Sequence, residues 1–230
     1  MRHLNLEESG RFLSLPLKER KFAKTRLNVI EVFLEQLESR SFEEIKIKDI
    51  YLKAQISEPT FYNYFPEKED MVLLFIQIWS LQVSVFASQN KSTDSGYKLL
   101  SSLFRYTANE SKKNPRILLE IISFQAKKIQ TIKIPKLTLS ERLLLFPHQD
   151  GIQNLPAMGI EGLIKQALDS AEKRGELPSS TNWQNFGLAI AALFFGVPVI
   201  AFQTDQGLEK LWLESLSYLW LGAGGKKNKE

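Results

Sequence analysis

The chain has 230 residues, of which 43% are hydrophobic and 24% are charged, and its formal net charge is +4. These values are typical of a globular protein of one or two domains with a buried core. It contains no cysteine, which excludes thiol catalysis, disulfides and cysteine-ligated zinc. Its two histidines, His3 and His148, are too few and too far apart for a histidine-based metal cluster, so we expect neither a metal nor another cofactor.

The N-terminal segment, residues 1–16, contains acidic residues and lacks the apolar core of a signal peptide, so we expect a flexible arm. The absence of cysteine also fits a reducing cytoplasm, where we expect the protein to act. Between Arg11 and Arg26 there are six basic residues and one acid. This stretch is a candidate for contact with phosphate groups, and a solvated helix face explains it about equally well.

Two short helical patterns separated by a tight turn follow a longer predicted helix at residues 17–39. The first short pattern runs from Ile47 to Ala54, with apolar residues at the spacing of one helix face. Ser57 has a side chain that can cap the second short helix, and Pro66 ends it. Two short helices joined by a tight turn form the helix-turn-helix pattern, whose second helix enters the major groove of DNA.

The residues of this segment also follow a family pattern, Ser57-x-x-Thr60-Phe61-Tyr62-x-Tyr64-Phe65-x-x-Lys68-Glu69. In this spacing the segment resembles the TetR family of bacterial one-component transcriptional regulators, over roughly residues 22–78. One departure lies in the turn, where Gln55 stands in place of the usual glycine. Because a backbone with positive φ strains any side chain with a Cβ, we expect a slightly different turn here.

The resemblance and the continuing helical periodicity together predict an all-α fold. We expect an N-terminal three-helix DNA-binding domain at residues 17–66, a connecting helix at 66–90, a C-terminal ligand-binding and dimerisation domain at 91–222, and a disordered tail at 223–230. Further helices are predicted at 97–112, from 115 to about 129, and at 158–174, 183–203 and 208–221. Between 131 and 156 the pattern is irregular, and only residues 140–146 have the pattern of a short helix.

The exposed front of the second short helix supplies the candidate base contacts. We expect Glu58, Thr60 and Asn63 to reach base edges, because a carboxylate accepts from cytosine and an amide pairs with adenine. Phe61 and Phe65, four residues apart, are expected to face the core instead. The remaining predicted DNA-binding residues, mainly phosphate contacts, are Lys24, Lys46, Lys48, Ser57, Pro59, Tyr62, Tyr64 and Lys68.

The resemblance implies an effector pocket in the C-terminal domain. A mostly apolar pocket with few polar groups would suit a small lipophilic or aromatic ligand. For each aromatic residue the alternative is ordinary core packing. The candidate ligand-binding residues are Trp79, Phe104, Tyr106, Phe124, Gln125, Phe146, His148 and Phe194.

The stretch from Trp183 to Gln203 is almost wholly apolar, with no charge from Phe186 to Phe202. Because a membrane helix needs about 20 apolar residues, we expect a buried helix and no membrane partner. The resemblance implies that this helix and the next pair with their mates in a homodimer; the alternative is that they complete the core of one chain. The predicted dimerisation residues are Phe186, Ala189, Ala192, Leu193, Gly196, Leu211, Trp212, Leu216 and Leu219.

The resemblance therefore implies a regulator, most simply a repressor that binds a palindromic operator as a dimer and leaves it when a small hydrophobic ligand binds. An enzyme is the first rival class, but no serine–histidine–acid set and no glycine-rich phosphate loop after a strand is visible in the sequence. An all-helical protein-interaction module is the second rival class, and a ligand-independent transcriptional activator is the third.

Overall fold

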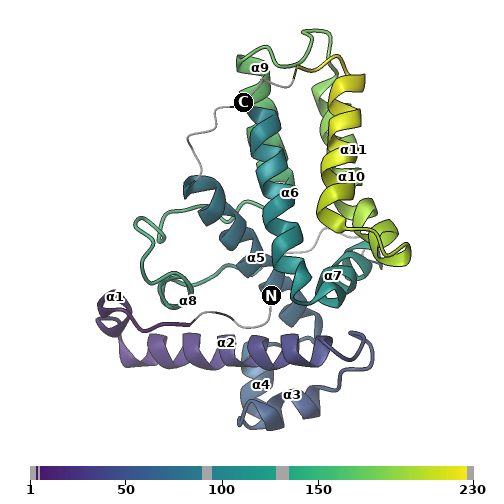
Figure 1. Cartoon of the computed structure of the whole chain (residues 1–230). Helices are drawn as coiled ribbons and strands as arrows, with labels where there is room; N and C mark the ends of the chain where they lie inside the picture. Colours follow the sequence, from purple (N-terminus) through teal and green to yellow (C-terminus); the bar gives the residue numbers. More distant parts are fainter. Residues whose placement is uncertain (1–3, 5, 90–94, 128–134, 227–230) are drawn as a thin grey trace. The chain divides into compact units, whose positions relative to one another are not determined.

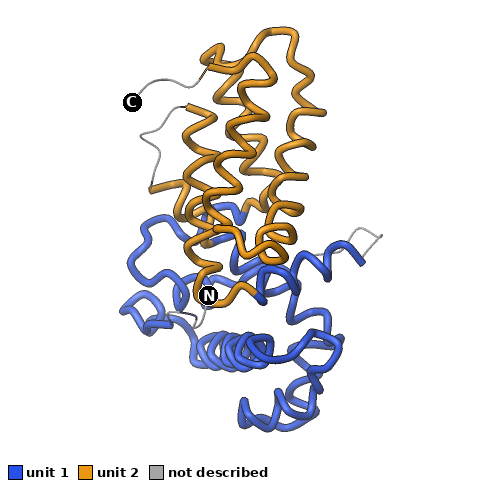
Figure 2. Tube along the Cα trace, turned by 45° about the vertical axis from the view of Figure 1, so that its right-hand side comes forward, with its two compact units in different colours: residues 1–81, 116–157 blue, residues 82–115, 158–230 orange. Residues whose placement is uncertain are grey.

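The computed structural model describes residue 4 and residues 6–89, 95–127 and 135–226. In these residues the chain forms eleven helices and no strand, which confirms the predicted all-α class (Figure 1). The chain divides into two compact units, which are coloured separately in Figure 2. Unit 1 comprises residues 1–81 and 116–157, and unit 2 comprises residues 82–115 and 158–230.

Unit 1 contains the predicted DNA-binding helices at nearly the predicted bounds. They are α2 (Leu17–Leu37), α3 (Ile47–Lys53), α4 (Glu58–Tyr64) and the first part of α5 (Glu69–Gln89). Figure 1 shows α3 and α4 next to each other below α2. The apolar face of α2, which includes Leu27, Ile30 and Phe33, is almost fully buried, as its periodicity predicts.

Unit 1 also contains helices that the sequence did not assign to the DNA-binding domain. These are α1 (Gly10–Leu13), α7 (Pro115–Lys127) from Arg116 onward, and α8 (Leu139–Leu145). The helix α8 packs on α2 and α1, and the Arg26 guanidinium lies 2.9 Å from the Glu141 carboxylate. The compact units therefore differ from the predicted domains, because residues 116–157 cluster with the DNA-binding helices.

The segment expected to be a flexible arm contains α1, and Phe12 in this helix is fully buried. The Arg11 guanidinium donates to the carbonyl oxygens of Pro147 (2.6 Å) and Gln149 (3.2 Å). The described part of this segment is thus bound to the loop after α8. Residues 1–3 and 5 lie outside the described residues.

Unit 2 is a bundle formed by α6 (Gly96–Lys112), α9 (Ile160–Lys173), α10 (Trp183–Gln203) and α11 (Leu208–Gly222), with the end of α5. A buried carboxylate fixes the start of α6: Glu176 accepts from the backbone N–H of Gly96 (3.1 Å) and of Tyr97 (3.2 Å). Such a cap stabilises a helix because the first N–H groups have no intrahelical acceptor.

Parts of three expectations fall outside the described residues: the break at 90–94, the irregular segment at 128–134 and the tail at 227–230. The tail residues that are described are bonded to unit 2, since the Lys226 N–H donates to the Glu176 carbonyl at 2.9 Å. Residues 140–146 correspond to α8, which confirms a short helix in the irregular segment.

Two of the described helices, α5 and α10, are long and apolar enough to cross a membrane by length and composition alone. The most apolar window of α5 is 67% buried within the chain, as for a core helix, and that of α10 is 33% buried. The helix α10 was expected to be a buried helix, but it buries only one face. Leu188, Ala192, Gly196 and Ile200 lie exposed on the other face.

Candidate nucleic-acid interface

The turn between α3 and α4 keeps a left-handed residue at the position where the family pattern has glycine. Gln55 has φ 57°, so the chain adopts the strained backbone and does not avoid it with a different turn. The Ile56 N–H donates to the Tyr51 carbonyl at 3.0 Å, which closes the turn. Ser57 then caps α4, as predicted, by accepting from the Thr60 N–H at 3.3 Å.

The two faces of α4 differ in the way that its spacing predicts. Phe61 and Phe65 are fully buried, with ring centroids 5.7 Å apart. On the opposite face Tyr62 is 42% exposed and Asn63 is also exposed. Thr60 is half-buried, and its hydroxyl lies 2.7 Å from the Ser57 hydroxyl. Polar side chains therefore lie along the front of α4, together with the exposed Glu58 and Pro59.

The predicted phosphate-binding residues are in different environments. Lys46 and Lys48, at the start of α3, are exposed. Lys24 is exposed and lies 2.5 Å from the Glu8 carboxylate. The Tyr64 ring is half-buried and lies 5.1 Å from the Phe22 ring. Of these residues, Lys46 and Lys48 are therefore the best placed for their charges to meet a phosphate group.

The ammonium group of Lys68 points into unit 1. It donates to the Phe42 carbonyl oxygen and, at 3.4 Å, to the Glu43 carbonyl oxygen. It also lies 4.5 Å from the centroid of the Phe42 ring. Burial lowers the pKa of Lys68, and the negative charges of Glu43 and Glu69 oppose that shift.

The predicted ligand-binding residues are divided between the two units. Phe104 and Phe194 belong to unit 2 and pack with Trp212, with centroids 5.3 to 5.9 Å apart. Tyr106 stacks on Phe86 at 4.5 Å, and burial and the charge of Glu110 raise its pKa to about 12. The other five residues, in unit 1, are Trp79, Phe124, Gln125, Phe146 and His148.

The unit 1 members do not gather into one apolar pocket. The Phe124 ring lies 5.7 Å from the Phe42 ring, beside the DNA-binding helices. His148 is exposed, and its Nε2 lies 3.1 Å from the Glu7 carboxylate. Gln125 and Phe146 are half-buried, on α7 and at the end of α8. The sequence identified aromatic residues without indicating which of them share a compact unit.

The predicted dimerisation residues also differ in exposure. Phe186, Trp212 and Leu216 are buried in the core of one chain, and the Trp212 indole N–H donates to the Leu193 carbonyl at 3.0 Å. Ala189, Leu193, Leu211 and Leu219 are half-buried, and Ala192 and Gly196 are exposed. The exposed large apolar side chains of α10 and α11, which were not predicted, are Leu188, Ile200, Tyr218 and Leu221. The spacing of 188, 192, 196 and 200 is the signal in the sequence that identifies this stripe.

Comparison with known proteins supports the assignment of the N-terminal helices. Residues 29–74 match the sequence model of the family described as bacterial regulatory proteins, tetR family. A comparison with curated proteins finds no match. The family match covers the C-terminal half of α2, α3, α4 and the start of α5.

Solved structures with a similar fold include Thermus thermophilus FadR, a TetR family transcriptional repressor in complex with lauroyl-CoA. It is 18% identical, with a TM-score of 0.62, over 89% of this chain and 98% of that chain. A TetR transcriptional regulator from Rhodococcus sp. RHA1 is 14% identical, with a TM-score of 0.55, over 85% and 96%. The dihydroxyacetone kinase operon activator DhaS is 19% identical, with a TM-score of 0.53, over 87% and 96%.

At these identities the likeness establishes the fold, and the family match identifies the DNA-binding segment. The chain thus has the all-helical fold of TetR-type regulators, and its N-terminal helix-turn-helix matches the TetR family of bacterial regulatory proteins.

Proposed function

We propose that this protein is a transcriptional regulator that binds palindromic double-stranded DNA as a homodimer in the cytoplasm. The observation that supports this most directly is the outward front of α4, where Glu58, Tyr62 and Asn63 are exposed while Phe61 and Phe65 are sealed in the core. A helix that served only for packing would bury these polar groups or replace them with apolar ones.

The proposed contacts follow from the chemistry of the exposed side chains. Asn63 pairs with adenine, Glu58 accepts from cytosine, and Thr60 bonds a base or a phosphate. Lys46 and Lys48 approach the backbone, because their ammonium groups are open to solvent at the start of α3. The hydroxyl groups of Ser57, Tyr62 and Tyr64 add uncharged phosphate contacts, and Lys24 adds a charged one when it leaves Glu8.

The homodimer is proposed to form through α10 and α11. Leu188, Ala192, Gly196 and Ile200 form a stripe at intervals of four residues along α10, and Tyr218 is exposed on α11. Small residues in the stripe allow two helices to approach closely, and burial of the flanking leucine and isoleucine stabilises the pair by roughly 25 cal/mol per Å². A twofold axis would also give the operator its palindromic form.

A small lipophilic effector is the proposed signal. The solved FadR relative in complex with lauroyl-CoA supports ligand control within this fold, and the apolar core of unit 2 suits a lipophilic group. In this mode the protein is a repressor, which occupies its operator until the ligand binds and releases it from the DNA. The activator DhaS has the same fold, so we keep activation as the alternative mode.

DNA binding is tested by selecting duplexes from a random pool with the purified full chain, then titrating the best duplex and an unrelated one. We expect Asn63→Ala to weaken binding to the selected duplex about tenfold and to leave binding to the unrelated duplex unchanged. Lys48→Met should weaken both and lower the slope of log affinity against log salt by about 0.9. Failure to enrich any duplex would favour a protein-interaction module instead.

A further inference from the structure

The backbone of Phe42 and Glu43, in the loop between α2 and α3, is held from two sides within unit 1. The loop leads directly into α3, because Ile45 is fully buried and Lys46 is the N-cap residue of that helix. A shift of residues 42–43 therefore changes where α3 begins. This matters for DNA binding because Lys46 and Lys48, the proposed phosphate contacts, lie only three to five residues further along.

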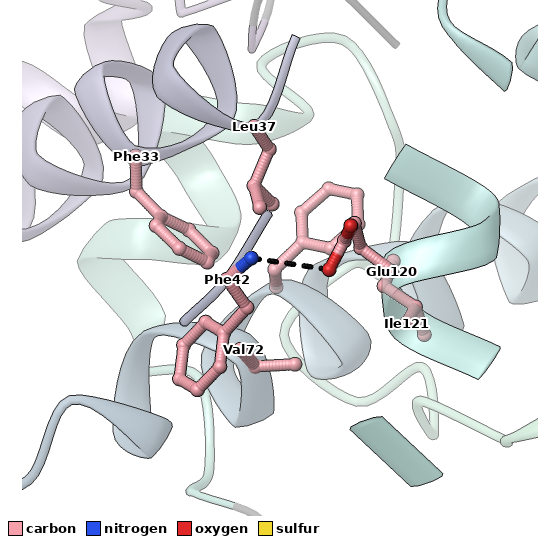
Figure 3. A pocket seen from close by; sticks show the side chains of 7 residues that line it. Phe33, Leu37, Phe42, Val72, Glu120 and Ile121 are labelled. Atoms are coloured by element: carbon pink, nitrogen blue, oxygen red, sulfur yellow. Dashed lines mark hydrogen bonds between the residues drawn. The ribbon is translucent and has the colours of Figure 1, made fainter. Parts of the chain in front are cut away.

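The first hold comes from α7. The Glu120 carboxylate accepts from the Phe42 N–H at 3.1 Å, and its side chain is only 18% exposed (Figure 3). Its other oxygen lies 3.8 Å from the Arg116 guanidinium, one helical turn earlier. Arg116 also donates to the Ser39 carbonyl at 3.5 Å, just after α2. The helix α7 thus binds both the start and the middle of the loop.

Apolar contacts make the same connection. The Phe42 ring lies edge-on to the Phe33 ring of α2 at 6.2 Å and to the Phe124 ring of α7 at 5.7 Å. Between the loop and α7 there remains a small apolar cavity of about 10 Å³, lined by Phe42, Glu120 and their neighbours. This cavity admits at most one water molecule, whereas a second pocket of about 220 Å³ is lined by Phe42, Glu43, Glu120 and Lys127 among others. The loop therefore depends on its specific contacts with α7, because the space around it is not filled throughout.

The second hold comes from Lys68, just before α5. Its ammonium group donates to the carbonyl oxygens of Phe42 and Glu43 and lies over the Phe42 ring. The N–H of Phe42 is thus bound by Glu120 while its carbonyl oxygen is bound by Lys68, and Glu43 forms a further ion pair with Lys127 of α7. With two N–H groups directed at carbonyl oxygens, the ammonium of Lys68 is oriented toward the protein.

We propose that Glu120 and Lys68 are positioning residues for DNA binding, which hold residues 42–43 so that α3 and its lysines meet the phosphate backbone in the correct register. This inference rests on the proposed function. It assigns Lys68 a role different from the phosphate contact expected from the sequence. It also gives α7 a direct connection to the DNA-binding helices.

The role of Glu120 is tested with two neutral variants of similar size, Glu120→Gln and Glu120→Met, in the full chain. Both remove the negative charge, which by itself leaves affinity for DNA unchanged or raises it. Only glutamine keeps an oxygen that accepts from the Phe42 N–H. We expect Glu120→Met to bind the selected duplex about tenfold more weakly than Glu120→Gln. Equal affinities of the two variants would overturn the proposal for Glu120.

The role of Lys68 is tested through the salt dependence of binding, with Lys46→Met as the matched control. Loss of a phosphate contact lowers the salt slope by about 0.9, as we expect for Lys46→Met. We expect Lys68→Met to weaken binding about tenfold with the slope of the wild type retained, because geometry is lost and no counterion site is removed. A slope that falls as much as in Lys46→Met would make Lys68 a phosphate contact.

A measurement without DNA separates this inference from the proposed function. Amide hydrogen exchange of residues 38–46 should be faster in Glu120→Met than in Glu120→Gln, since only the former leaves the Phe42 N–H without an acceptor. Equal exchange rates in the two variants would contradict the stabilisation of residues 42–43 by Glu120, even if every variant binds DNA. Absence of DNA binding by the wild type, with the exchange difference present, would refute the proposed function and the role in DNA binding, and would leave only the contact between Glu120 and residues 42–43.

Discussion

Gln55 provides a prediction at the scale of one residue. Its φ of 57° is unfavourable for a side chain with a Cβ, whereas glycine adopts it freely. We expect Gln55→Gly to raise the free energy of unfolding by up to about 1 kcal/mol, since relief of roughly 1–2 kcal/mol of strain is partly offset by the greater entropy of the unfolded chain. Urea denaturation measures this. Gln55→Ala keeps the Cβ and should change stability little; an equal gain from alanine would refute the strain explanation.

Tyr106 predicts a pH dependence at the same scale. Burial and the charge of Glu110 raise its pKa to about 12 from an ordinary value of 10. Above pH 10 the unfolded chain loses this proton more readily than the folded chain, so stability should fall as pH rises from 10 toward 12. Tyr106→Phe should remove the contribution of this tyrosine to the loss of stability between pH 10 and 12. It should also remove one ionisation at high pH from the absorbance titration of the tyrosines. Tyr62→Phe, at a 42% exposed position outside the proposed dimer surface, is the control and should retain both.

At the scale of an element, α8 is held to α2 by a buried ion pair. The Glu141 side chain is fully buried, and while one carboxylate oxygen lies 2.9 Å from Arg26 the other accepts from the Thr138 N–H at 2.7 Å. We expect Glu141→Ala to lower the free energy of unfolding by about 3–5 kcal/mol, because it leaves the arginine buried without its carboxylate and removes the carboxylate half of the capping box of α8. Urea denaturation provides the measurement.

Two further variants test that explanation. The double variant Arg26→Met with Glu141→Leu should recover most of the lost stability, because apolar residues of similar volume replace both charges. Lys165→Gln removes an exposed ion pair with Asp169 on α9, and it should change stability by less than about 1 kcal/mol. If Glu141→Ala were as mild as Lys165→Gln, the pair would not anchor α8.

At the scale of the whole molecule, the proposed dimer predicts the assembled mass. Leu188 and Ile200 are 63% and 52% exposed in one chain, on the stripe of α10. The double substitution of both residues by glutamate should convert the protein from twice 26.4 kDa to the 26.4 kDa of one chain, because four charges would meet at the twofold axis. Light scattering after size-exclusion chromatography measures the mass. Leu139→Glu, at an exposed leucine of α8, is the control and should leave the mass unchanged.

Local signals in the sequence were sufficient to predict the helix-turn-helix. Ser57 caps α4 through the N–H three residues later, and Pro66 ends the helix, so both bounds depend on a few neighbouring residues. The spacing of Phe61 and Phe65 likewise predicts which face of α4 is buried. The bounds of α10 were predicted for the same reason, since Asn182 caps its first turn.

Contacts between distant residues were decided only by the tertiary structure. Arg26 and Glu141 are 115 residues apart, and Phe42 and Glu120 are 78 apart, so no local pattern pairs them. For the same reason the sequence predicted an outward Lys68, whereas the folded chain places carbonyl oxygens within its reach. The sequence by itself determined the helical segments apart from the short α1, and which face of α4 is polar, because capping and periodicity act over a few residues. Which helices share a compact unit, and which charges stay open for DNA, depends on packing across the whole chain.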